Sequence, residues 1–118
     1  MAGIKSFKDL DIWKKGMILV KKTYDATKTF PVEEMYGLTS QMRRSAVSVP
    51  SNIAEGFRRK GPREFRHFLS IVLGSLAELE TQVIIARELG YASDDNGKAI
   101  QDLSDELSRM TLSLSHKL

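Results

Sequence analysis

The sequence predicts an all-α protein, an antiparallel up-down-up-down four-helix bundle that forms one domain over residues 1–118. Apolar residues recur at steps of three and four along most of the chain, which is the period of an α-helix. The prolines and turn glycines fall mostly between these periodic segments, and so divide the chain into four helices with short connections. No segment shows the alternation of apolar and polar residues that is typical of a strand.

The first helix is expected from about Leu10 to Lys28. Phe30-Pro31 ends it, because the residue before a proline disfavours helical backbone angles. The apolar spacing places the following residues on its inward face: Ile12, Trp13, Gly16, Met17, Val20, Tyr24 and Thr27.

The second helix is expected to begin near Val32 to Glu34, where acidic residues suit a helix N-terminus, and to continue to about Lys60. Pro50 lies inside it and removes one backbone hydrogen bond. We interpret Pro50 as a kink in one long helix, because the apolar spacing continues in phase on both sides. Two shorter helices are the alternative.

Gly61-Pro62 separates the second helix from a third, expected from about Pro62 to Leu89. The third helix carries a heptad pattern. The fourth helix is expected to begin after Ser93, which is a plausible N-cap, with acidic residues in its first turn. The two apolar seams are Phe65, Leu69, Val72, Leu76, Leu79, Val83 and Ala86 in the third helix, and Ile100, Leu103, Leu107, Met110 and Leu114 in the fourth.

A polar stripe runs along the second helix, on a face beside two apolar ones, and consists of Gln41, Arg44, Ser48, Asn52 and Glu55. We expect these residues to find partners on other helices or other chains. In a hairpin centred on Gly61, residues whose numbers sum to about 122 lie at the same height. Arg44 is then level with Glu78, and we predict that Glu78 is buried and paired with Arg43 or Arg44. The predicted structural polar network comprises Gln41, Arg43, Arg44, Asn52, Glu55 and Glu78.

The sequence offers no catalytic constellation, and we predict a protein that is not an enzyme and uses no cofactor or metal. It contains no cysteine, and its two histidines, His67 and His116, have no ligand partner at metal-site spacing. The serines have no paired base, and no glycine-rich phosphate loop is present. Glu78 and Glu80 lie two residues apart, so they point to different sides of a helix and cannot act as a pair.

A basic run lies at the turn between the second and third helices. Cations at the end of the second helix complement its dipole, but Arg63 and Arg66 crowd the positive N-terminus of the third. Arginines beside a helix N-terminus are suited to phosphate, so contact with an anion or nucleic acid is one interpretation and a solvated tip is the other. The candidate contact residues are Arg58, Arg59, Lys60, Arg63 and Arg66. Residues 1–60 hold twelve Lys/Arg against six Asp/Glu, so the first half of the chain is the basic one.

The third helix carries more apolar surface than one bundle core needs, which predicts a homo-oligomer. Leu73, Ala77 and Ile84 lie on one flank of its seam, and Ile71 and Ile85 on the other. We expect no membrane span, because residues 68–86 include two glutamates and several polar residues. The N-terminus lacks the apolar run of a signal peptide, and a chain without cysteine suits a reducing compartment, so we expect a cytoplasmic protein.

The sequence also resembles a known family. It resembles the bacterial four-helix-bundle proteins of 23S ribosomal RNA intervening sequences in a succession of short motifs: Phe7-x-x-Leu10-x-x-Trp13, Phe30-Pro31, Tyr36-Gly37-Leu38, Gln41-x-Arg43-Arg44, Asn52-Ile53-Ala54-Glu55-Gly56, Phe68-Leu69, Gly74-Ser75 and Leu89-Gly90-Tyr91. Gly16 and Ser45 depart from the pattern, since alanine is more usual at both positions. The resemblance implies a homopentameric ring and a relation to the accessory protein of diversity-generating retroelements, which binds a reverse transcriptase and nucleic acid.

Two functions from different classes follow from these observations. The first is a non-enzymatic ring that contacts RNA or DNA phosphates through the residues around Arg58 to Arg66. The second is a protein–protein adaptor or scaffold ring with no role in nucleic-acid binding. The residues identify neither the nucleic acid nor the partner protein.

Overall fold

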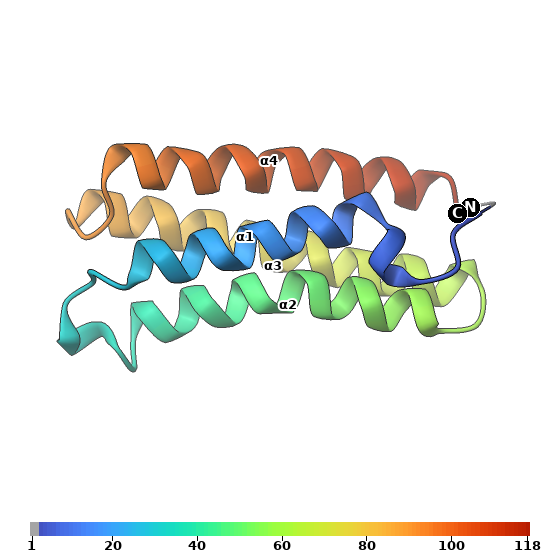
Figure 1. Cartoon of the computed structure of the whole chain (residues 1–118), viewed down its shortest axis with the longest axis horizontal. Coiled ribbons are helices and arrows are strands. Elements are labelled where there is room, and N and C mark those ends of the chain that lie inside the picture. The colour runs from blue at the N-terminus through green and yellow to red at the C-terminus, as the bar shows by residue number, and fades with distance from the viewer. Residues whose placement is uncertain (1–2) are drawn as a thin grey trace.

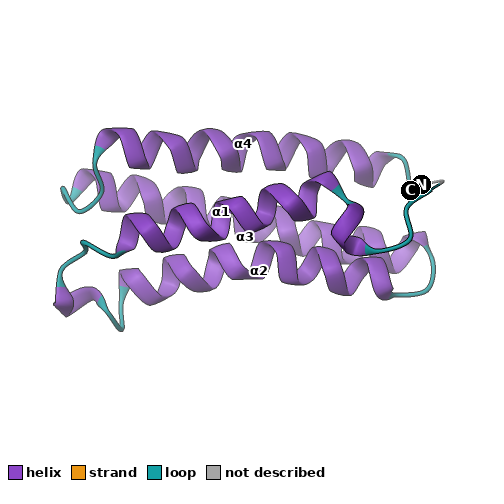
Figure 2. Cartoon of the chain, viewed as in Figure 1, coloured by secondary structure: helices purple, strands orange, loops and turns teal. Residues whose placement is uncertain are grey.

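The computed structural model describes residues 3–118, and it forms four long helices that lie antiparallel to one another (Figure 1). No strand occurs within this described range (Figure 2). The helices are α1 (Asp11–Thr27), α2 (Leu38–Arg58), α3 (Pro62–Glu88) and α4 (Asp94–His116), and two short 3-10 helices, η1 (Phe7–Asp9) and η2 (Val32–Glu34), precede α1 and α2.

The four helices close into a square, with α1 packed on α2 and α4, and α3 packed on the same two helices. Among the described residues no Cα atoms of the diagonal pairs, α1 with α3 and α2 with α4, come within 8 Å of each other. The bundle is 45 Å long and 23 by 19 Å across. The predicted up-down-up-down bundle is therefore confirmed.

The apolar seam of α3 forms the centre of the core, as its heptad spacing predicts. All seven of its predicted members are buried, Phe65 and Leu69 near the first turns and Val83 and Ala86 near the last. By length and composition α3 is also apolar enough to cross a membrane. Composition alone therefore does not exclude a membrane span, contrary to the expectation from the sequence. The buried seam, packed against α2 and α4, is that of a core helix.

The inward face of α1 differs from the predicted one. Its buried positions include Leu19, Thr23 and Ala26, whereas Tyr24 is exposed and Met17 and Val20 are only half-buried. The hydroxyl of Thr23 donates a hydrogen bond to the carbonyl oxygen of Leu19 at 2.8 Å, and so needs no partner outside the helix. The prediction was right for Ile12, Gly16 and Thr27, and it missed Leu19, Thr23 and Ala26.

α2 begins at Leu38 rather than near Val32, which corrects the predicted start. Val32–Glu34 forms a 3-10 turn instead, and from that turn the Glu34 carboxylate accepts a hydrogen bond from the backbone N–H of Leu38 at 3.1 Å. The other Glu34 oxygen accepts a hydrogen bond from the Tyr91 hydroxyl at 3.3 Å. Partial burial and the nearby Glu34 carboxylate raise the pKa of Tyr91. Glu34 thus caps α2 from outside the helix and ties it to the α3–α4 connection.

α2 continues through Pro50 as one helix, so the alternative of two shorter helices is not adopted. Gly16 of α1 lies opposite this proline, and a Cβ built on Gly16 would lie 3.4 Å from the Pro50 Cβ. The small residue therefore leaves room for α1 to pack against the proline ring.

The α2–α3 hairpin brings two helices into close contact beside its turn. Gly61 adopts a φ of 95°, a conformation that a residue with a Cβ rarely takes. A Cβ on Gly56 would lie only 2.6 Å from the Cβ of Phe68, so glycine is required there for the close approach of α3. Phe57 and Phe65 meet across the hairpin edge to face, with ring centroids 6.0 Å apart, as the predicted register requires.

Candidate nucleic-acid interface

The candidate contact residues lie at one end of the bundle, on the last turn of α2, the turn at Gly61 and the first turns of α3. All five of them are exposed: Arg58, Arg59, Lys60, Arg63 and Arg66. The structure thus brings together the predicted cluster on one exposed hairpin.

Two of these arginines rest on aromatic rings. The guanidinium carbon of Arg58 lies 5.4 Å from the centroid of Phe7, and that of Arg59 lies 5.1 Å from the centroid of Phe68. Arg59 also pairs with Glu55 at 3.6 Å, one turn earlier on α2. Both partners of that pair are about half exposed, so it is solvated and weak. The rings therefore fix the direction of the two side chains without neutralising their charge.

The other three cations have no carboxylate partner. Across residues 3–118, no Asp or Glu oxygen lies within 4 Å of the terminal nitrogens of Lys60, Arg63 or Arg66. Arg63 and His67 line an open hollow on the first turns of α3, together with Glu64 and Phe68. These cations remain available to an external anion.

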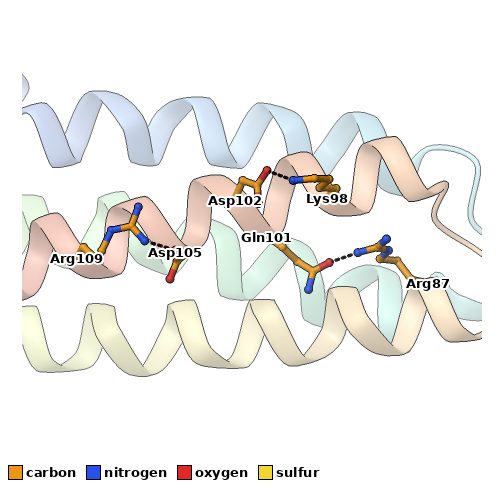
Figure 3. Close-up of polar contacts among 6 residues, drawn as sticks. All are labelled: Arg87, Lys98, Gln101, Asp102, Asp105 and Arg109. Atoms are coloured by element: carbon orange, nitrogen blue, oxygen red, sulfur yellow. Dashed lines mark hydrogen bonds and ion pairs between the residues drawn. The ribbon is translucent and has the colours of Figure 1, made fainter.

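Cations near α4 are arranged differently (Figure 3). Lys98 pairs with Asp102 at 2.7 Å, and Arg109 pairs with Asp105 on the next turns of the same helix. Arg87 of α3 points toward α4, where it donates a hydrogen bond to Gln101. Most cations on this side of the bundle thus have a neighbouring acceptor, which sets the hairpin cluster apart.

The polar stripe of α2 faces α3, where part of it forms hydrogen bonds. The hydroxyl groups of Ser48 and Ser75 lie 2.8 Å apart, across the two helices. The side-chain amide of Asn52 donates to the carbonyl oxygen of Ser48 at 2.8 Å and to its hydroxyl at 2.9 Å. Beside them a hollow of about 250 Å³ is lined by Gln41, Arg44, Ser45, Ser48, Ser75, Glu78 and Gln82.

The predicted buried pair between Glu78 and an arginine is wrong within the single chain. Glu78 is exposed and makes no ion pair in the described part of the protein. Arg44 lines the same hollow, as the register predicts, but is also exposed. Arg43 turns to α1 instead: its Nε donates to the Thr27 hydroxyl at 2.8 Å, and its guanidinium lies 4.6 Å from the ring centroid of Tyr24.

The predicted polar network did not include two polar residues of this face, Ser75 and Gln82. Ser75 bonds to Ser48, whereas the side-chain oxygen of Gln82 is buried and has no hydrogen-bond partner among the described residues. The register rule that placed Arg44 beside Glu78 would have found both, since it also pairs Ser48 with Ser75 and Gln41 with Gln82. Within residues 3–118, no group of three or more acidic or histidine side chains is placed to hold a metal ion.

These features define a small all-α bundle with a polar face between two helices and an unpaired basic hairpin at one end. Residues 8–113 match the family model described as 23S rRNA-intervening sequence protein, and the chain belongs to this family. No curated protein matches the chain. Among solved structures, a protein of unknown function from the S23 ribosomal protein family of Bacteroides thetaiotaomicron is similar, with a TM-score of 0.80 and 21% identity over 88% of this chain and 97% of that chain. At this identity the likeness concerns the fold alone.

Proposed function

We propose that the protein is a non-enzymatic, cytoplasmic homo-oligomer, a pentameric ring, that contacts the phosphates of RNA or DNA through its basic hairpin. The observation that carries the nucleic-acid role is the set of exposed cations without carboxylate partners at Lys60, Arg63 and Arg66. Like charges crowded at a helix N-terminus destabilise a fold unless an anion compensates them. A phosphate backbone supplies that anion.

Apolar side chains that stay exposed on the single chain support assembly. Ile71, Ile84 and Ile85 of α3 are 37%, 41% and 43% exposed although the core is complete without them. The exposed Arg44 and Glu78 and the unpartnered Gln82 oxygen lie on the adjoining α2–α3 face. A second copy that covers this face would bury Ile71 and Ile85 and supply partners to the polar groups. Ile84 lies on the other flank of the α3 seam, where a ring would place a different contact.

Ring assembly would strengthen phosphate binding without any new type of contact. In a closed cyclic ring every copy presents its basic hairpin in the same sense relative to the symmetry axis. Several weak phosphate contacts on one nucleic acid then act together, because each contact after the first is intramolecular.

A mobility shift with a structured RNA at low and at high salt tests the nucleic-acid role. Binding is expected at low salt and should weaken steeply as salt is added. On duplex DNA each neutralised phosphate contributes about −0.9 to the slope of the logarithm of the binding constant against the logarithm of the salt concentration. Arg58→Ala/Arg59→Ala/Arg63→Ala should abolish the shift. The matched control, Lys15→Ala/Lys28→Ala/Lys98→Ala, removes the same charge from cations that are paired with a nearby carboxylate, and it should bind like the parent. No shift at low salt, or equal binding by both variants, contradicts the proposal.

A second candidate function, a protein adaptor, is supported by the opposite end of the bundle. Four apolar side chains are exposed there, Val32 (72%), Met35 (51%), Tyr36 (93%) and Leu89 (55%). Exposed apolar residues gathered at one end are typical of a protein contact. A pull-down that returns one protein partner regardless of nuclease treatment, and that is lost in Tyr36→Ser/Leu89→Ser, would favour this function over the first.

A further inference from the structure

The antiparallel topology gathers segments that are far apart in the sequence at the end of the bundle where the basic hairpin lies. The first described residues, from Gly3 on, and the C-terminus lie at that end, beside the α2–α3 connection (Figure 1). We define the basic end by its lysines and arginines, which come from the N-terminal segment, the hairpin and the C-terminus: Lys5, Lys8, Arg58, Arg59, Lys60, Arg63, Arg66 and Lys117.

The N-terminal segment is held against the hairpin by defined contacts. The Phe7 ring stacks edge to face on Trp13, with centroids 5.5 Å apart, and the Arg58 guanidinium lies on the same Phe7 ring. A capping box closes the η1 turn: the Ser6 hydroxyl accepts from the backbone N–H of Lys8, and the Asp9 carboxylate accepts from the backbone N–H of Ser6, each at 3.2 Å. The turn that carries Lys8 is therefore held beside the Phe7 ring on which Arg58 lies, with the Lys8 Nζ 6.0 Å from the centroid of that ring, and Lys5 directly precedes the turn.

Charge is distributed unevenly between the two ends of the bundle. At the basic end, residues 3–10, 55–66 and 115–118 hold eight Lys/Arg against three Asp/Glu. At the opposite end, residues 25–34 and 87–98 hold six Asp/Glu against three Lys/Arg. The resulting field points along the 45 Å axis of the bundle and steers a polyanion to the basic end.

The aromatic rings at the basic end already have a neighbouring side chain on at least one side. Arg58 lies on Phe7 and Arg59 lies on Phe68, which also lines the hollow beside Arg63, and Phe65 packs edge to face on Phe57. Single-stranded nucleic acid is held largely by stacking of its bases on free aromatic rings, whereas a double helix presents phosphates. A duplex carries one charge per ~1.7 Å of its axis, so a stretch as wide as this end offers roughly a dozen phosphates. The chemistry of this end favours a duplex.

We propose that the whole basic end, including Lys5, Lys8 and Lys117, is one surface that binds the phosphate backbone of double-helical nucleic acid. This proposal rests on the proposed function, because it specifies the surface and the class of ligand. It goes beyond the hairpin by adding lysines from both termini. Recognition through phosphates alone makes binding independent of base sequence.

The test measures affinity for a 20-base-pair RNA duplex and for a single-stranded oligouridylate of equal length, over a series of salt concentrations. We expect the duplex to bind at least tenfold more tightly. For the duplex we compare the slope of the logarithm of the binding constant against the logarithm of the salt concentration. Lys5→Ala/Lys8→Ala/Lys117→Ala should reduce the magnitude of this slope by about 2 to 3, close to one for each phosphate contact removed. Lys21→Ala/Lys22→Ala/Lys98→Ala has the same net charge but loses lysines elsewhere on the bundle, and its salt dependence should equal that of the parent.

The outcomes separate this inference from the proposed function. Parent binding that is abolished in the hairpin variant but unchanged in Lys5→Ala/Lys8→Ala/Lys117→Ala keeps the proposed function and overturns the extended surface. Equal losses in both lysine variants show that net charge alone matters and also overturn it. Equal affinity for duplex and single strand overturns the choice of ligand. A folded parent that binds neither RNA overturns the proposed function, and the extended surface with it.

Discussion

The same substitution, glycine to alanine, is predicted to have opposite effects at Gly56 and Gly16. In both helices alanine is intrinsically favoured by about 1 kcal/mol, because glycine loses more conformational freedom on folding. The surroundings decide the sign. A Cβ on Gly56 would lie 2.6 Å from the Cβ of Phe68 and 3.1 Å from Cδ1 of Phe65. The first of these atoms is attached directly to the α3 backbone and cannot turn away, so the two helices must separate.

The magnitude follows from the balance of these two effects. Forcing an extra carbon into a packed interface costs about 1–3 kcal/mol. The 2.6 Å approach is far inside normal contact distance, so the upper part of this range applies, about 2–3 kcal/mol. After the propensity gain is subtracted, we expect Gly56→Ala to lower the free energy of unfolding by ~1–2 kcal/mol, which in a chain of this length lowers Tm by about 3–8 °C. At Gly16 the nearest atoms, on Pro50 and Val49, would lie 3.4 Å from the new Cβ. This is an ordinary contact, so Gly16→Ala should raise the free energy of unfolding by ~0.5–1 kcal/mol.

Thermal and urea unfolding followed by circular dichroism measures both effects. Parent and variants must be compared at one protein concentration, because assembly makes Tm depend on concentration. A Gly56→Ala variant as stable as the parent would refute the close approach of α2 and α3 beside the hairpin. A Gly16→Ala variant less stable than the parent would refute the space opposite Pro50.

Three further predictions concern single polar groups. Ser104 and Thr111 of α4 are fully buried, and their hydroxyls have no hydrogen-bond partner within residues 3–118. Thr111→Val should therefore raise the free energy of unfolding, measured by urea titration, by about 1 kcal/mol. A decrease of that size would instead reveal a hydrogen-bond partner of the Thr111 hydroxyl. The raised pKa of Tyr91 favours its neutral form in the folded state, so this stabilisation is complete below the ordinary value of 10.0 and is lost at higher pH. The parent should therefore lose stability more steeply than Tyr91→Phe as the pH rises above 10, and parallel curves above that pH would exclude the bond to Glu34. In the dissociated single chain, Glu78→Ala should change the free energy of unfolding by less than about 0.5 kcal/mol because the side chain is exposed and unpaired there. A loss of ~3 kcal/mol or more at a dilution where the chain is monomeric would restore the buried ion pair.

Much of the fold follows from the sequence because apolar spacing and chain punctuation agree. The heptad of α3, the turn at Gly61 and the Ser93 cap, whose hydroxyl accepts from the backbone N–H of Asn96 at 3.1 Å, were all predicted and are all present. The hairpin register followed from the turn position alone. These features are local, or are connected by one short turn, so they need no knowledge of the whole bundle.

The features that were missed depend on tertiary contacts. Thr23 and Ala26 face the core because neighbouring helices come close to α1, which hydrophobicity does not indicate. Glu34 was predicted to lie in the first turn of the second helix, where an acidic residue is favourable. It lies instead in a separate turn before α2 and caps the helix from there. The contact of Arg58 with Phe7 joins residues about fifty positions apart, and the sequence pattern does not indicate that these two segments meet. The cations of the hairpin were therefore predicted as one cluster, whereas the lysines of the N-terminal segment were not.

The polar face between α2 and α3 was predicted in position but not in its pairing. A register rule gives the height of a residue on a helix, and it does not say whether a long side chain points inward or outward. Arg43 bonds to Thr27 of α1, while Glu78 remains in solvent. Ser48, Asn52 and Ser75, with short side chains close to the backbone, form the hydrogen bonds that the stripe implied.

The most direct test of nucleic-acid contact at the basic end is chemical acetylation of lysines, read by mass spectrometry, with and without a bound RNA duplex. The account predicts that the duplex protects Lys5, Lys8, Lys60 and Lys117, all at that end of the bundle. Lys21, Lys22 and Lys98, which lie away from it, should be acetylated equally in both states. Protection spread evenly over all seven lysines, or confined to the second group, would contradict the account.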